Sequence, residues 1–441
     1  MSWFGWRDTL ACMDSWRRID VPQLPGSGEV PRITSTATGE LTEAATGPDA
    51  KLYVCGITPY DATHIGHAAT FTAWDLLIRA LLDAGVAVTY VQNVTDVDDP
   101  LIERANRDGE DWRALALRET ERYRRDMEAL RLLPPDHLIG AVEALPIIAR
   151  FNARLAEHGA LYTVDEDVYF ARSADPEFGA LSGPGTVSDY DPAEMAILSA
   201  EHGGDPGRPG KKDPLDCLVW RAERPGEPAW PSDFGPGRPG WHVECAAIAG
   251  EYLGVSFDVQ AGGADLVFPH HEMSASHARV AHSPAPEVFA RVYAHSGLVS
   301  YQGAKMSKSL GNLVFVSRLL ADGVDPMAIR LALLAHHYRS EWEWTEEGLA
   351  EAEARLSRWR DAIARSTASA ETAHAVLDAV RAALADDLDS VRALAVIDGW
   401  AETVLSGDAA TGPGQGAELI RQMADALLGV TVLNTDPRGD L

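Results

Sequence analysis

The fold is decided by the stretch Lys51-Leu-Tyr-Val-Cys-Gly-Ile-Thr-Pro-Tyr-Asp-Ala-Thr-His-Ile-Gly-His67. Its apolar run at 52–54, bounded by a glycine and a proline, predicts a buried strand. The next segment has helical spacing of apolar residues and closes at Gly85, as a C′ glycine does. A strand, a glycine-containing turn and a helix N-terminus form an anion-binding site, because free N–H groups and the positive end of the helix dipole point outward there. His64 and His67 stand at this turn and could hydrogen-bond nucleotide phosphates; a helix-capping turn with solvated histidines is the alternative.

A second strand is predicted within 86–99, and polar residues gather at its carboxyl end. With the first strand and helix it makes a βαβ unit, which is right-handed by rule. Open α/β sheets place their ligands at the carboxyl ends of strands. The polar cluster could therefore receive a substrate amine or a Mg²⁺ ion; alternatively, Asp98 and Asp99 cap the next helix. The cluster consists of Asn93, Thr95, Asp96, Asp98 and Asp99.

Far downstream, Lys305-Met-Ser-Lys-Ser309 places Lys305 and Lys308 around small hydroxyl residues. Such a cationic loop suits the holding of triphosphate charge as it shifts during a reaction. Taken alone, a solvated basic loop is the alternative. His64-Ile-Gly-His67 followed by this loop resembles the signature pair of class I aminoacyl-tRNA synthetases, whose chemistry is the adenylation of a carboxylate.

The charge balance bears on the acceptor. The chain has 441 residues, which suggests roughly three domains, and its 38 Lys+Arg against 66 Asp+Glu give a net charge of −28. A protein that grips a polyanion normally presents a basic face. The composition therefore favours a small acceptor and predicts no nucleic-acid partner.

The composition also predicts a cytoplasmic protein. Four cysteines, at positions 12, 55, 217 and 245, are too few and too scattered for a disulfide scaffold in a chain of this length. No apolar run approaches the roughly 18 residues of a membrane span, and the N-terminal segment lacks a signal-peptide core.

Three soft or borderline metal ligands follow separate predicted strands or loops: Cys55, Cys245 and His270. Converging on one sheet edge, they could hold Zn²⁺ with an open fourth position, as a catalytic zinc site does. The spacing matches no zinc-ribbon pattern, and buried cysteines with a capping histidine are the alternative reading of the spacing alone.

Four blocks, at 53–61, 90–99, 237–245 and 265–272, are similar to cysteinyl-tRNA synthetase. That resemblance implies a zinc ion that binds the substrate thiolate, with ligands at Cys55, Cys245 and His270. The chain also departs from the synthetase. Ser274 stands where the synthetase has its fourth zinc ligand, a glutamate, and Pro100 stands where a lysine usually follows the Asp-Asp pair. After the helical region that ends near residue 428 we find no basic tRNA-recognition tail.

These departures resemble a related family, the cysteine ligases of mycothiol biosynthesis, and the resemblance extends over about residues 16–428. Those ligases join cysteine to the amine of 1D-myo-inosityl 2-amino-2-deoxy-α-D-glucopyranoside (GlcN-Ins). The loop Glu201–Pro206 is also similar, although His202 stands where that family more often has arginine. From its residues alone this loop reads as a polar turn.

The resemblance implies an ATP-dependent reaction with Mg²⁺, one zinc per chain, and the small-molecule substrates L-cysteine, ATP and GlcN-Ins. Its catalytic residues, which hold the phosphates, would be His64, His67, Lys305 and Lys308. We expect a monomer without membrane or nucleic-acid contacts; the alternatives are a cysteinyl-tRNA synthetase and a non-catalytic paralogue. The expected contacts of the nucleotide and the cysteinyl group are Cys55, Gly56, Ile57, Thr58, Thr70, Asn93, Val94, Thr95, Trp241, Gly263, Ala264, Asp265 and Val299.

The resemblance and the element pattern together predict an α/β fold. A Rossmann-like parallel-sheet domain carries an insertion and is followed by an all-α bundle, in which residues 349, 352, 356, 359 and 363 form a core stripe. The expected segments are a lead-in (1–50), the first half of the catalytic domain (51–133), a connective insertion (134–214), the second half with the zinc site and the lysine loop (215–312), stem-contact helices (313–345) and the C-terminal bundle (346–441).

Overall fold

The computed structural model describes residues 13–61, 63–285, 289–306, 311–365, 369–407 and 415–432. Its centre is a parallel five-stranded sheet in the order β11-β10-β3-β4-β5. From the middle strand the chain steps outward in one direction through β4 and β5, and later in the other through β10 and β11. The resulting switch point between β3 and β10 is where open α/β sheets bind ligands. The strands are β3 (Asp49–Ile57), β4 (Ala87–Val94), β5 (His137–Gly140), β10 (Ser256–Gly263) and β11 (Phe289–Ser296).

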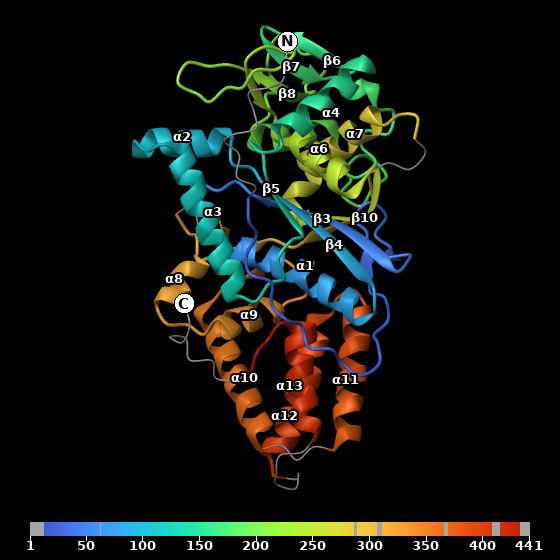
Figure 1. The fold of residues 1–441 in the computed structure, drawn as a ribbon, viewed down its shortest axis with the longest axis vertical. Helices are drawn as coiled ribbons and strands as arrows, with labels where there is room; N and C mark the ends of the chain where they lie inside the picture. The colour runs from blue at the N-terminus through green and yellow to red at the C-terminus, as the bar shows by residue number, and fades with distance from the viewer. Residues whose placement is uncertain are drawn as a thin grey trace.

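The predicted strand–turn–helix unit is present. β3 leads through the turn into α1 (Ile65–Asp83), which packs against the sheet (Figure 1). His64 is the N-cap, and its side chain accepts the backbone N–H groups of Gly66 and His67. Gly85 has φ +81°, as predicted for the residue that ends this helix. A register shift between Val54 and Ile57 places a bulge at the carboxyl end of β3, a device that often re-aims side chains beside active sites.

Residues 217–220 lie at the start of the segment 215–312, predicted to hold the second half of the catalytic domain, but they do not join the main sheet. They belong to β8, which pairs antiparallel with β7 in a separate four-stranded sheet. Conversely, β5 lies within 134–214 but joins the main sheet. A short apolar run predicts a strand without identifying its partner. The second sheet consists of β6 (Leu161–Val164), β7 (Asp167–Phe170), β8 (Cys217–Ala222) and β9 (Gly237–Pro239). The functional division of the chain into segments stays a prediction.

Helix α6 (Trp241–Leu253) begins within the sequence block 237–245. The consequence is that Trp241, His242 and Cys245 all lie in its first two turns. The other helices of this half are α2 (Asp99–Asp108), α3 (Trp112–Ala129), α4 (Leu145–Glu157), α5 (Pro192–Glu201) and α7 (Glu272–Ala281), with the irregular turns η2 (Ala264–Leu266) and η3 (Val267–His271) before α7.

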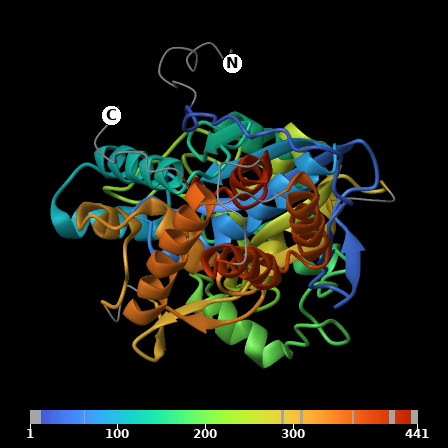
Figure 2. The ribbon, with the colours of Figure 1, turned by 90° about the horizontal axis from the view of Figure 1, so that it is seen from below.

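The C-terminal helices gather at the end of the molecule opposite the insertion (Figures 1 and 2). The predicted stripe on α10 is confirmed, since Ala352, Leu356 and Trp359 are buried and the flanking Leu349 and Ile363 are partly buried. The helices are α8 (Val316–Ala321), α9 (Pro326–Leu334), α10 (Glu346–Arg365), α11 (Ala370–Ala385), α12 (Ser390–Leu405) and α13 (Gln415–Leu428). Short strands complete the structure: β1 (Arg32–Thr34), β2 (Leu41–Glu43), β12 (Val299–Tyr301), β13 (Ala304–Lys305) and β14 (Trp342–Glu343).

A buried ionic cluster ties this bundle to α1. Asp75 accepts hydrogen bonds from Arg79 (2.7 Å) and from Arg330 of α9. Arg79 also donates to the carbonyl of Asp425 (2.8 Å), and Arg330 donates to that of Leu428 (2.5 Å). These carbonyls lie at the carboxyl end of α13, where a helix favours cations.

Among the described helices, none is long and apolar enough to cross a membrane.

Candidate active site and metal centre

A cleft of about 1060 Å³ opens at the carboxyl ends of β3, β4 and β10 and extends to the insertion. It brings together most of the predicted contacts from widely separated parts of the chain. Val94, Ala264 and Val299 are not part of its described lining, and Val94 is fully buried within the sheet. Lys305 lies on β13 and Lys308 falls outside the described residues. The predicted residues that line the cleft are Cys55, Gly56, Ile57, Thr58, His64, His67, Thr70, Asn93, Thr95, Trp241, Cys245, Gly263, Asp265 and His270.

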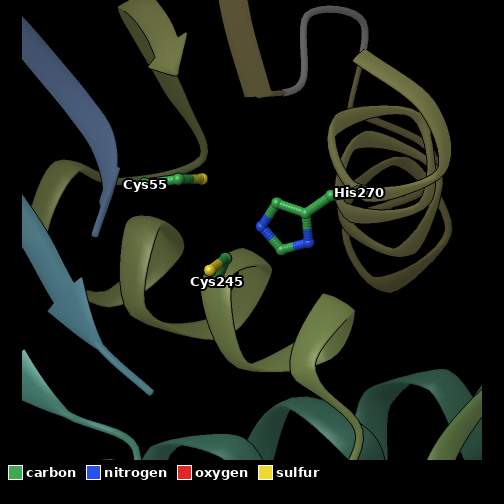
Figure 3. Close-up of side chains that lie close together, drawn as sticks. All are labelled: Cys55, Cys245 and His270. Carbon is green, nitrogen blue, oxygen red and sulfur yellow. The ribbon is translucent and has the colours of Figure 1, made fainter. Parts of the chain in front are cut away.

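The three predicted metal ligands converge. Cys55 comes from β3, Cys245 from α6 and His270 from η3, and their ligand atoms all lie within 4.8 Å of one another. All three side chains are buried and face a common space (Figure 3). Two thiols and one imidazole form a donor set that suits Zn²⁺.

Among the described residues the metal group has three candidate protein ligands, and Ser274 is not a fourth. Ser274, which stands in place of a fourth ligand, is fully buried, and its hydroxyl donates to the backbone carbonyl of His242 (3.0 Å). Trp241 stacks on the His270 imidazole with ring centroids 4.2 Å apart. Because Trp241 also lines the cleft, a ligand entering there would meet the group beside an aromatic wall.

The two thiols share a site in which one of them ionises more readily. Burial alone raises the pKa of the Cys55 thiol, but contacts with Cys245 and His270 outweigh burial and bring that pKa below its ordinary value. Burial and the neighbouring Cys55 raise the pKa of Cys245. A bound cation would favour loss of both protons, as zinc does with thiol ligands.

A chain of hydrogen bonds leads from the Cys55 sulfur through two histidines to Thr36. The Cys55 sulfur lies 3.2 Å from Nε2 of His271, and His271 Nδ1 lies 2.7 Å from Nε2 of His295. His295 Nδ1 is in turn 2.7 Å from the hydroxyl of Thr36. The side-chain amide of Gln260 donates to the same sulfur at 3.3 Å. These contacts orient the ligand and surround it with donors, the usual task of groups behind a metal ligand.

A second buried network lies beside Cys245. The backbone N–H of Gly56 donates to Oδ1 of Asn93 (2.9 Å), while Asn93 and Thr95 both donate to Oε1 of Glu244 (3.0 and 2.9 Å). Burial raises the pKa of Glu244 to about 8. Sequence reasoning missed Glu244 as a partner of the polar cluster, although it directly precedes a predicted ligand.

The two signature histidines stack on each other, with ring centroids 3.8 Å apart. His64 uses Nδ1 to cap α1. His67 is half-buried, and the desolvation of its ring lowers its pKa to about 4. Among the described residues Nδ1 of His67 has no hydrogen-bond partner. His67 therefore lines the cleft as a neutral imidazole near pH 7.

The acidic pair after β4 divides its roles. Asp98 is the N-cap of α2, accepting the backbone N–H of Asp99 (2.8 Å). Asp99 forms ion pairs with Arg221 (2.7 Å) and Arg238. The capping alternative is thus confirmed for Asp98. Asp99 instead connects the start of α2 to the second sheet, through Arg221 of β8 and Arg238 of β9.

The Glu201–Pro206 loop is more than an isolated polar turn, because its residues 201–205 line the cleft. Its Asp205 accepts hydrogen bonds from Tyr169 and, at 2.9 Å, from Lys211. Nδ1 of His202 lies 2.8 Å from the carbonyl of Leu198. Nothing in the local sequence indicates that this loop faces the main sheet across the cleft.

Comparison with known proteins identifies the class. Residues 42–354 match the family described as "tRNA synthetases class I (C) catalytic domain", and the chain belongs to this family. Methionyl-tRNA synthetase from Mycobacterium tuberculosis, solved with methionyl-adenylate, is 15% identical with a TM-score of 0.58 and covers 86% of this chain and 92% of its own. The LeuRS of Agrobacterium radiobacter K84, solved with tRNA and LeuAMS, is 12% identical with a TM-score of 0.60 and covers 87% and 84%. The predicted fold class is confirmed.

Within the class, the chain groups with proteins named L-cysteine:1D-myo-inositol 2-amino-2-deoxy-alpha-D-glucopyranoside ligase. The protein of that name from a Parafrankia species is 56% identical over 98% of this chain and 96% of its own length. The one from Thermomonospora curvata is 57% identical over 95% of this chain and its whole length. The family expected from the sequence motifs is therefore confirmed.

Proposed function

We propose that this protein is an ATP-dependent ligase that activates L-cysteine as cysteinyl-adenylate and transfers the cysteinyl group to the amine of GlcN-Ins. The observation that carries the proposal is the Cys55–Cys245–His270 group beside Trp241. It sits in the cleft of a class I synthetase sheet, and full-length relatives named for this ligation support the choice of acceptor. Use of ATP accords with the family.

The proposal assigns Zn²⁺ to Cys55, Cys245 and His270, because a buried set of two thiols and an imidazole within 4.8 Å fits that ion. When bound, zinc supplies a positive charge that stabilises the thiolate form of the substrate cysteine. A pocket built around that thiolate would discriminate against serine by leaving its polar groups poorly satisfied.

The remaining roles belong to the chain's own residues. The N-terminus of α1, with His64 and His67, binds the phosphates of ATP. Lys305 and Lys308 neutralise the negative charge of these phosphates. Thr58 and Asp265 contact the cysteinyl-adenylate.

The reaction has two steps. The cysteine carboxylate attacks the α-phosphate and releases pyrophosphate. The acceptor amine then attacks the adenylate carbonyl, giving an amide and AMP. Mg²⁺ accompanies ATP as substrate.

A tRNA-charging role is the competing function. The net charge of −28, Pro100 and Ser274 favour the small acceptor. We further infer a monomeric cytoplasmic enzyme with no nucleic-acid partner.

The deciding experiment measures AMP release by the purified protein with ATP, Mg²⁺ and cysteine, with GlcN-Ins in one reaction and cysteine tRNA in another. We expect AMP formation driven by GlcN-Ins, with the mass of the cysteinyl amide. Charging of tRNA with no response to the sugar would refute the proposal.

The metal assignment has its own measurement. Purified wild-type protein should carry about one zinc per chain by elemental mass spectrometry, and Cys245→Ser should lose most of it. Cys217→Ser is the matched control, because Cys217 lines the same cleft without belonging to the metal group. Equal zinc content in all three proteins would contradict the assignment.

A further inference from the structure

The cleft is larger than the adenylate side requires. Pockets for single small ligands span roughly 300–1,000 Å³, and this one, at about 1060 Å³, continues beyond the predicted adenylate contacts. We call this continuation the insertion side of the cleft; its lining includes Asp98, Asp99, Glu103, His202, Arg221 and Arg238. It therefore joins the carboxyl end of β4 and the start of α2 to the second sheet.

The charge of the cleft suits a cation. Among the described lining residues there are nine carboxylates and four guanidinium groups. Pro100 also lines the cleft and carries no charge. A cleft with this excess of carboxylates attracts an ammonium-bearing ligand.

Asp98 contributes to this side of the cleft a carboxylate oxygen without a partner in the described chain. Asp99 is held by Arg221 and Arg238. Asp98 uses Oδ1 to cap α2, and across the described part of the chain no hydrogen bond or ion pair is found to its Oδ2. Arg238, 3% exposed, also has an Nε donor without a partner among these residues. Buried polar groups in native proteins are nearly all paired, so the unpaired Nε of Arg238, beside the half-buried Asp98, indicates a site that a ligand completes.

The position of Asp98 connects it to the reacting end of the cleft. The backbone N–H of Thr95 donates to the carbonyl of Ile57 (2.9 Å), which joins the ends of β3 and β4. Asp98 follows Thr95 by three residues and shares the cleft lining with Thr58 and Tyr60. Burial raises the pKa of Asp98 to about 6, with Asp99, Arg221 and Arg238 as the charged groups that face it. The carboxylate is therefore ionised at neutral pH and more basic than an exposed aspartate.

We propose that the insertion side of the cleft binds the amino-sugar acceptor and that Asp98 is the catalytic base of the transfer step. This proposal rests on the proposed function. The bound ammonium first loses one proton to solvent; the neutral amine nitrogen then attacks the carbonyl carbon of cysteinyl-adenylate and a C–N bond forms. The C–O bond to the phosphate breaks, AMP leaves with the electron pair, and the proton lost by nitrogen passes to Oδ2 of Asp98.

Asp98→Asn tests the base separately from the helix cap, because asparagine caps helices as well as aspartate does. Cysteine-dependent ATP–pyrophosphate exchange measures the first step. Mixing preformed enzyme-bound cysteinyl-adenylate with GlcN-Ins and measuring the amide by mass spectrometry gives the second. Loss of a general base costs about 10²–10⁴ in rate. We expect transfer to slow by about 100-fold or more, with exchange within threefold of wild type.

The matched control is Asp111→Asn, the same substitution at the exposed N-cap of α3, which lies outside the described cleft lining. It should leave both steps unchanged. Asp98→Ser, which keeps a capping oxygen without a carboxylate, should repeat the transfer defect.

Each remaining outcome is decisive. Transfer at the wild-type rate in both Asp98 variants would overturn the proposal, and so would an equal loss of exchange and transfer in a folded variant. If wild-type enzyme activates cysteine but transfers nothing to GlcN-Ins, the proposed function fails, and the acceptor site falls with it.

Discussion

Gly56→Ala tests how closely β3 and β4 approach beside the site. A Cβ at position 56 would lie 1.7 Å from the carbonyl oxygen of Asn93 and 3.2 Å from Cγ of Gln92. The first contact is with backbone, so the strands must separate. Overpacking of this kind costs about 1–3 kcal/mol. Loss of the hydrogen bond from the Gly56 N–H to Asn93 adds about 1 kcal/mol. We expect a decrease of about 2–4 kcal/mol in the free energy of unfolding.

The substitution should also impair chemistry, because Asn93 and Thr95 hold Glu244 beside Cys245. Urea unfolding followed by tryptophan fluorescence gives the stability, and cysteine-dependent pyrophosphate exchange gives the activity. The control is Gly399→Ala in α12, where an added Cβ meets nothing within 4 Å and alanine should stabilise by about 0.4–1 kcal/mol. Unchanged stability and exchange in Gly56→Ala would refute the close approach of the two strands.

Three further outcomes are expected. Asp75→Asn leaves two buried guanidinium groups without their anion, and should destabilise the fold by about 3–5 kcal/mol in denaturant titrations. The control, Asp322→Asn, breaks an exposed ion pair and should change the free energy of unfolding by less than about 1 kcal/mol. Equal effects of the two substitutions would contradict the role of burial. Burial raises the pKa of Asp126 to about 7 in the folded protein, above its value of about 4 in the unfolded chain. The folded state therefore holds the proton more tightly, and the free energy of unfolding falls as the pH rises from about 4 to 7, by up to about 4 kcal/mol. Asp126→Asn should therefore stabilise more at pH 8 than at pH 5, and a pH-independent effect in unfolding measurements would exclude this explanation. Chelation of the wild-type protein should abolish cysteine activation, and added Zn²⁺ should restore it; activity that survives complete zinc removal would contradict the metal assignment.

The strand–turn–helix unit was predictable because its signals are local. The apolar run, the capping His64 and the closing Gly85 each act within a few residues, and the structure contains all three. The metal group came from a family resemblance, since Cys55, Cys245 and His270 are far apart in sequence.

What the sequence could not predict depends on long-range pairing. β8 has the composition of a sheet strand, but only its antiparallel partner β7 decides which sheet it joins. Thr36 bonds to His295 across 259 positions, and Glu244 receives its partners from a strand 150 residues earlier. No periodicity within a window of a few turns contains such information. The 201–205 loop was read as a polar turn for the same reason: its neighbours across the cleft come from other segments.

The tie between α1 and α13 has a consequence for how the protein matures on the ribosome. Arg79, on the helix that begins at the signature histidines, bonds to a carbonyl 346 positions later, and Arg330 bonds to Leu428. Arg79 and Arg330 also donate to the carbonyls of Arg131 and Leu130, respectively. Until α13 emerges from the exit tunnel, however, each guanidinium group lacks its remaining carbonyl partners, and an incompletely paired charge is costly to bury. A nascent chain can thus form its sheet early, but the helix that carries the phosphate-binding end gains its full set of hydrogen bonds only after α13 has been made.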